Sequence, residues 1–151
     1  EKILSKQEQR LLGNVTHDCL AHIALPVDIA SAMKKVMPRY PMISESRHSE
    51  IASRLLEIVN HENFRRWFVK EVPMFNEQEI VLANGSPVRP DRVMVYDEYW
   101  EVVDFKTGVP NVKHHDQVYG YMMQLESISG KPVKGYLAYT SDYEVVEVTR
   151  D

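Results

Sequence analysis

The chain contains a single cysteine, Cys19, among its 151 residues. One cysteine excludes an internal disulfide and a zinc site built from cysteines, and it fits a reducing compartment, so we expect a cytoplasmic location of the bacterial type. No apolar run approaches the roughly 18 residues that a membrane-spanning helix needs, so we expect no membrane partner. The sequence also shows no signal-peptide pattern, internal repeat or low-complexity tract.

An excess of positive charge is also missing. The formal net charge is −4, which is not typical of a nucleic-acid-binding domain. Residues 1–70 carry 11 Lys and Arg against 8 Asp and Glu, whereas residues 71–151 carry 7 against 14. Basic residues of the first half offer a modest surface for a phosphate backbone, although a solvated helical surface explains most of them individually. These residues are Lys34, Lys35, Arg39, Arg47, Arg54, Arg65, Arg66 and Lys70.

The pattern of apolar residues and breakers predicts an α/β domain with a mixed central β-sheet flanked by helices. We expect helices over 6–24, 28–36, 46–60 and 112–128. We expect strands over 75–82, 88–96, 99–106, 133–139 and 144–148, with a turn at Asn84-Gly85. The length fits one domain over 1–151. Because the chain begins with Glu1 and not Met, we expect this domain to be part of a longer protein.

Two acidic residues oppose each other in the predicted hairpin of residues 90–108. A tight turn at 97–98 places Asp91 opposite Asp104, with Cβ atoms about 5 Å apart, where like charges repel. A divalent cation between the carboxylates removes the repulsion. Side chains alternate along a strand, so Lys106 shares a face with Asp104 while Phe105 points away. A three-residue loop would shift this register, and ordinary surface salt bridges are the alternative explanation.

This hairpin resembles the core motif of the RecB-like nucleases, a branch of the PD-(D/E)XK nuclease superfamily. That motif is an Asp followed by Asp-aromatic-Lys-Thr-Gly, matched here by Asp91 and by residues 104–108. Residues 13–17 (Gly-Asn-Val-Thr-His) resemble the upstream Gly-x-x-x-His motif, and residues 117–121 (Gln-Val-Tyr-Gly-Tyr) the downstream Gln-x-x-x-Tyr motif. Residues 135–139 (Gly-Tyr-Leu-Ala-Tyr) resemble the closing strand. The motifs occur in the order of the family.

The resemblance implies a restriction-endonuclease-like core with a divalent-metal site. In that site His17, Asp91, Asp104 and the backbone carbonyl of Phe105 would bind Mg²⁺ or Mn²⁺. Asp91, Asp104 and Lys106 would be catalytic, with Lys106 orienting the attacking water or stabilising the transition state. Without the resemblance, His17 is better explained as a half-exposed helix histidine.

Some members of this family hold an iron–sulfur cluster with four cysteines. With Cys19 alone, this chain cannot ligate such a cluster.

Polar residues of the last predicted helix form a second candidate set. Lys113, Gln117 and Tyr121 follow each other at intervals of four and share a helix face, which suits contact with phosphates and bases. The resemblance implies that Gln117 and Tyr121 line the groove and position DNA; a polar helix surface is the alternative. Glu79 is a further candidate for the metal, although an exposed strand glutamate explains it equally well. His114 and His115 could touch phosphate, but we expect both to be simply exposed to solvent.

We therefore predict a metal-dependent deoxyribonuclease of exonuclease type. RecB-like domains commonly end helicase–nuclease proteins that process DNA ends in recombination and repair. The chain has no Gly-x-x-x-x-Gly-Lys-Ser/Thr phosphate loop, so a helicase or ATPase partner would lie outside it. The alternative is a catalytically inactive DNA-binding or docking module of the same fold. The chemistry of the site does not exclude RNA as a substrate.

Overall fold

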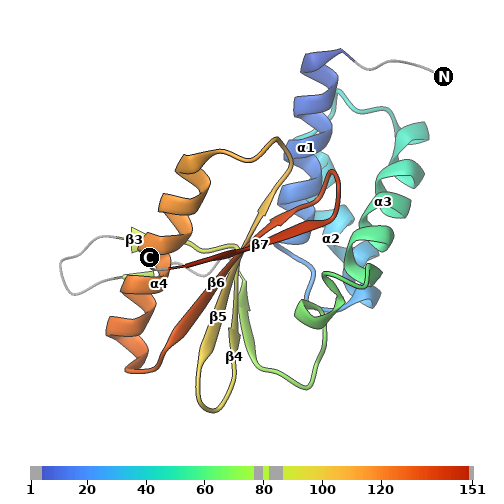
Figure 1. Cartoon of the computed structure of the whole chain (residues 1–151). Coiled ribbons are helices and arrows are strands. Elements are labelled where there is room, and N and C mark those ends of the chain that lie inside the picture. Colours follow the sequence, from blue (N-terminus) through green and yellow to red (C-terminus); the bar gives the residue numbers. More distant parts are fainter. Residues whose placement is uncertain (1–4, 77–79, 82–86, 150–151) are drawn as a thin grey trace. The chain divides into compact units, whose positions relative to one another are not determined.

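The computed structural model describes residues 5–76, 80–81 and 87–149. The chain divides into two compact units, Glu1–Phe68 and Val69–Asp151. Figure 1 shows the first unit as a group of helices and the second as a twisted sheet with one long helix. No helix in these described segments combines the length and the hydrophobicity needed to cross a membrane.

The first unit is helical. Its helices are α1 (Lys6–Leu20), α2 (Ile29–Val36) and α3 (His48–Asn60). Single 3₁₀ turns lie at Pro26–Asp28 (η1), Met37–Arg39 (η2), Glu45–Arg47 (η3) and Arg65–Trp67 (η4). Helix α1 begins after Ser5, whose hydroxyl accepts a hydrogen bond from the Glu8 backbone N–H at 3.1 Å. This N-cap satisfies one of the amide groups that have no partner inside the helix.

The predicted helices of this unit are present, with one end misplaced. The prediction extended the first helix to residue 24, but α1 ends at Leu20. The amides of His22 and Ile23 bond to carbonyls three residues earlier, at Cys19 and Leu20, so the chain tightens into turns before Pro26. Proline disfavours helical backbone in the residue before it, and Leu25 is extended accordingly, with φ −130° and ψ 156°.

The second unit is built on a five-stranded sheet with the order β1-β4-β5-β6-β7. The strands are β1 (Met74–Asn76), β4 (Arg92–Val95), β5 (Trp100–Lys106), β6 (Val133–Tyr139) and β7 (Glu144–Val148). Strands β5 and β6 are parallel and joined by α4 (Val112–Ser129), whereas the other neighbours are antiparallel. The predicted α/β fold with a mixed sheet is therefore confirmed.

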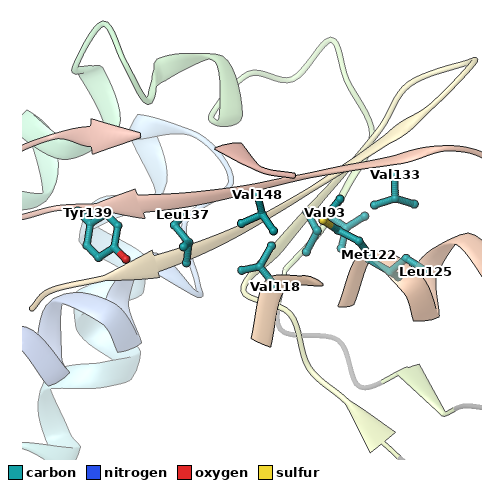
Figure 2. Packing of buried hydrophobic residues seen from close by; sticks show 9 residues of the cluster. Val93, Val118, Met122, Leu125, Val133, Leu137, Tyr139 and Val148 are labelled. Atoms are coloured by element: carbon teal, nitrogen blue, oxygen red, sulfur yellow. The ribbon is translucent and has the colours of Figure 1, made fainter. Parts of the chain in front are cut away.

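Helix α4 packs on one face of this sheet. Asn111 caps its start by accepting a hydrogen bond from the Lys113 N–H at 2.9 Å, and Gly130 ends it with φ 69°. Positive φ is accessible to glycine without the steric cost that a Cβ atom brings. Figure 2 shows side chains of α4 directed at those of the strands. The buried cluster comprises Val93, Val102, Val118, Met122, Leu125, Val133, Leu137, Tyr139 and Val148.

The β4–β5 hairpin has the predicted register. Val93 pairs with Val102, and the Tyr96 N–H donates to the Tyr99 carbonyl at 3.0 Å around a two-residue loop. The Tyr96 and Tyr99 rings stack with centroids 4.7 Å apart. Because the loop is short and the cross-strand pairs are buried, a shift by one residue would turn the apolar side chains to the wrong face.

Two predicted strands were drawn too long. The segment 75–82 contains β1 and a separate strand β2 (Ile80–Val81), which pairs with β3 (Pro87–Val88) in a second, two-stranded sheet. The segment 88–96 likewise joins the end of β3 to β4. Pro90 interrupts it, because proline has no N–H to donate to a ladder. The predicted turn at Asn84-Gly85 lies outside the described residues.

Candidate active site

Two carboxylates meet where the β4–β5 ladder ends. Asp91 directly precedes β4, and its Oδ2 accepts a hydrogen bond from the Phe105 backbone N–H at 2.9 Å. Asp104 lies on β5 and is only 3% exposed. The side chain of Asp91 thus takes the place of a backbone partner for β5. This bond brings its carboxylate beside that of Asp104, as the register predicts.

The charge state of Asp104 reflects this crowding. Burial raises its pKa from 3.8 to about 7; the charge of Asp91 and a hydrogen bond with that residue act in the same direction, and Lys106 opposes them. Desolvation and a neighbouring anion both disfavour an ionised carboxylate. The pair is therefore costly in its fully ionised form, and a bound cation would remove that cost.

The backbone of Phe105 faces the same side of β5 as Asp91. In a strand, the N–H and C=O of one residue point to the same neighbour. The Lys106 carbonyl, one residue on, accepts from the Thr140 N–H on the β6 side, so the Phe105 carbonyl is directed to the β4 side. Continuing the ladder from the Arg92–Val103 pair places Pro90 opposite Phe105.

A chain of polar contacts continues from Asp104 onto α4. The Lys106 Nζ lies 2.9 Å from the Asp104 Oδ2 and donates a hydrogen bond to the Gln117 Oε1 at 2.7 Å. The Gln117 Nε2 in turn donates to the Tyr121 hydroxyl at 3.2 Å. Burial raises the pKa of Tyr121, and the charge of Asp104 adds to that effect. The structure thus brings together six of the predicted residues, all within the second unit: Asp91, Asp104, Phe105, Lys106, Gln117 and Tyr121.

A contact between two residues beside Lys106, Tyr139 and His114, was not predicted from the sequence. Tyr139 ends β6 as the register partner of Lys106, and its hydroxyl lies 3.0 Å from the His114 Nδ1. The prediction that His114 and His115 are exposed is wrong, because both are half-buried, His114 against this phenol. Burial lowers the pKa of His114, and the charge of Lys106 adds to the effect. Only the parallel pairing of β5 with β6 brings residues 114 and 139 together, and sequence spacing does not reveal it.

The other predicted site residues are placed as follows. Lys113 is exposed in the first turn of α4. His17 is half-buried in α1 of the first unit, with its Nδ1 3.9 Å from the Asp18 Oδ1. Its role as a metal ligand stays a prediction. Glu79 lies outside the described residues.

The donors present suit a hard divalent cation. Two carboxylates and a carbonyl directed to the same side are the oxygen ligands that Mg²⁺ and Mn²⁺ prefer. Among the described residues, no three His, Cys, Asp or Glu side chains are grouped closely enough to hold a metal ion. The carboxyl pair therefore fits a cation that completes its shell with backbone carbonyl oxygen, water or substrate, as Mg²⁺ commonly does.

Comparison with known proteins identifies the family of this chain. The family model of the PD-(D/E)XK nuclease superfamily matches residues 2–144, which is nearly the whole chain. No curated protein matches the sequence. The match includes the carboxyl pair, Lys106 and the polar residues of α4.

Proposed function

Because the chain belongs to the PD-(D/E)XK nuclease superfamily, we propose that it is a divalent-metal-dependent deoxyribonuclease that hydrolyses phosphodiester bonds. Members of this superfamily are generally nucleases and usually depend on divalent metal ions. The observation that carries the proposal is the convergence of Asp91, Asp104 and Lys106 where β4 and β5 stop pairing. Such a set supplies anionic ligands for a cation and a positive charge for the phosphate.

Each residue has a distinct role in this proposal. Asp91 and Asp104 would hold Mg²⁺ or Mn²⁺, with the Phe105 carbonyl as a third ligand. His17 belongs to the first unit, and its role as a ligand stays a prediction. When bound, the cation neutralises charge on the scissile phosphate and lowers the pKa of a bound water. Lys106 orients the attacking water or stabilises the charge of the transition state. Its ammonium group is held before substrate arrives, which limits reorganisation during the reaction.

Helix α4 would contact the substrate. Gln117 is exposed and Tyr121 half-buried, and Lys113 is exposed one turn before Gln117. An amide, a phenol and an ammonium group suit contact with phosphate oxygens and with the faces of bases. We propose that these three side chains position the DNA backbone across the carboxyl pair.

The order of the motifs supports a more specific proposal. We place the chain in the RecB-like branch and infer that it serves DNA end processing in recombination or repair. Exonuclease action and a helicase or ATPase partner outside these residues belong to this proposal. A single cysteine is consistent with the cluster-free members of that branch.

The test is a cleavage assay on labelled single-stranded DNA, double-stranded DNA and RNA, each with Mg²⁺, Mn²⁺ or EDTA. We expect cleavage of DNA in the presence of either cation and none in EDTA. Lys106→Ala should lower the rate by about 100- to 1000-fold, the size seen when one transition-state donor is removed. Lys131→Ala is the matched control, because it removes a lysine that instead bonds to the Asp97 carbonyl in the hairpin loop.

Four outcomes would contradict the proposal or a part of it. Cleavage that persists in EDTA would exclude metal dependence, and full activity in Lys106→Ala would exclude the role of this lysine. Binding of DNA without cleavage under every cation would favour the docking module over the enzyme. Cleavage of RNA alone would support metal-dependent phosphodiester hydrolysis but contradict DNA as the substrate.

A further inference from the structure

One buried hydroxyl connects the sheet to the start of α4. Tyr139 is 2% exposed at the end of β6, and its hydroxyl lies 3.0 Å from the Nδ1 of His114 in the first turn of α4. Burial raises the pKa of Tyr139, and the backbone amide of Asn111 and the charge of Lys106 act in the opposite direction. The phenol oxygen therefore lies among groups of the helix start and beside the strand end that carries Lys106.

The ring of Tyr139 alone would be enough for packing. A phenylalanine would bury the same apolar ring in the cluster beneath α4 without a polar atom to satisfy. A buried hydroxyl is unfavourable unless it has hydrogen-bond partners, and here both belong to the start of α4: the His114 ring and the Asn111 backbone amide. The hydroxyl thus favours one position of the first turn of α4, whereas apolar packing of the ring alone does not require that position.

Helix α4 is fixed to β6 at two places. Near its middle, Val118 and Met122 lie so close to Gly135 that a Cβ atom there would be 2.7 Å from the Val118 Cγ1. At its start, Tyr139 holds His114. Gln117 lies between these anchors, where its Oε1 accepts a hydrogen bond from Lys106 at 2.7 Å. An increase of less than about 1 Å in the distance between these two atoms would break this hydrogen bond.

We propose that Tyr139 is a positioning residue of this site: through His114, its hydroxyl sets the start of α4 and so keeps Gln117 within reach of Lys106. The inference rests on the proposed function for its catalytic consequence. Tyr139 acts on Lys106 through the helix and not by contact with substrate. Strand β6 and His114, which the proposed chemistry does not otherwise use, thereby have a role in the site.

The test is Tyr139→Phe, which removes the hydroxyl and keeps the ring. The first readout is the side-chain amide signal of Gln117 in ¹⁵N–¹H spectra of the metal-free protein, assigned by its disappearance in Gln117→Ala. We expect this signal to shift in Tyr139→Phe and in His114→Ala, since each breaks the same contact. Tyr96→Phe is the matched control, because it removes a phenol hydroxyl that faces Glu101 at the hairpin loop, and it should leave the signal unchanged.

The second readout is the cleavage rate. Loss of one positioning hydrogen bond should lower kcat about tenfold. In a Gln117→Ala background, Tyr139→Phe should have no further effect, since both changes act through one path.

The outcomes separate this inference from the proposed function. A Gln117 signal that stays in place in Tyr139→Phe overturns the inference, whatever the activity. Fully additive losses of kcat in the double variant also overturn it. If the Gln117 signal shifts in Tyr139→Phe but the wild type cleaves no nucleic acid, the positioning contact is supported and only the nuclease proposal is overturned.

Discussion

At the scale of single residues, the main feature of the site is that Asp91 and Asp104 are held close together although their carboxylates repel each other. A surface pair of carboxylates would separate into solvent, but the Phe105 N–H holds Asp91 in place and β5 buries Asp104. Lys106 offsets the effects of burial and of the Asp91 charge only in part, since the pKa of Asp104 still rises to about 7. This arrangement lowers stability in the absence of a ligand and is typical of functional sites.

A pH-dependent loss of stability follows for the metal-free protein. Between pH 3.8, the ordinary pKa of the side chain, and about pH 7, Asp104 keeps its proton in the folded state and loses it in the unfolded state. The folded state then binds more protons, so the free energy of unfolding should fall as the pH rises through this range. Urea denaturation in EDTA at several pH values measures it.

Asp104→Asn provides the comparison for this pH dependence. The amide cannot titrate, so we expect a shallower fall in the free energy of unfolding between pH 4 and 7. Adding Mg²⁺ at pH 7 should stabilise the wild type and have little effect on the variant. Equal pH slopes in the two proteins would show that Asp104 is not the group responsible.

At the scale of elements, the close approach of α4 to β6 positions the polar side chains. Gly135 permits this approach, because a Cβ atom there would lie 2.5 Å from the Met122 Sδ and 2.7 Å from the Val118 Cγ1. Both partners belong to the buried cluster beneath the helix. Because Gln117 on this helix bonds to Lys106, the distance between α4 and Gly135 affects the geometry of the site.

Gly135→Ala should therefore destabilise the protein. Insertion of a methyl group into a packed core typically costs about 1–3 kcal/mol, measurable as a lower midpoint of urea denaturation. Val118→Ala in the same chain makes room and should recover part of the loss. Gly120→Ala is the matched control: its Cβ would meet no atom within 4 Å, and alanine at this helical position should stabilise by about 0.5–1 kcal/mol. Equal effects at both glycines would contradict the packing argument.

The elements also show what the sequence can predict. The β4–β5 register followed from a two-residue loop and from the alternation of side chains, both of which are local. Segments 75–82 and 88–96 were wrong because a run of strand-forming residues does not reveal which partner each part pairs with. The contact between His114 and Tyr139 depends on the parallel pairing of β5 with β6, which spacing cannot give.

At the scale of the whole molecule, the chain combines two compact units that differ in charge. The described part of the first unit is helical and contains His17 and the predicted basic positions up to Arg66, and the second contains the carboxyl pair and Lys106. The family match from residue 2 to residue 144 includes parts of both units. A negative net charge of the whole chain is compatible with phosphate binding by a local group of basic residues, as proposed above.

The central claim is that Asp91 and Asp104 together hold a divalent cation, and calorimetric titration of Mn²⁺ into the whole chain tests it most directly. We expect the wild type to bind Mn²⁺, and Asp91→Asn and Asp104→Asn to bind it roughly tenfold more weakly or worse, because affinity follows the number of charged ligands. Lys106→Ala should bind at least as tightly as the wild type. Equal Mn²⁺ affinity in the wild type and both Asp variants would contradict the account.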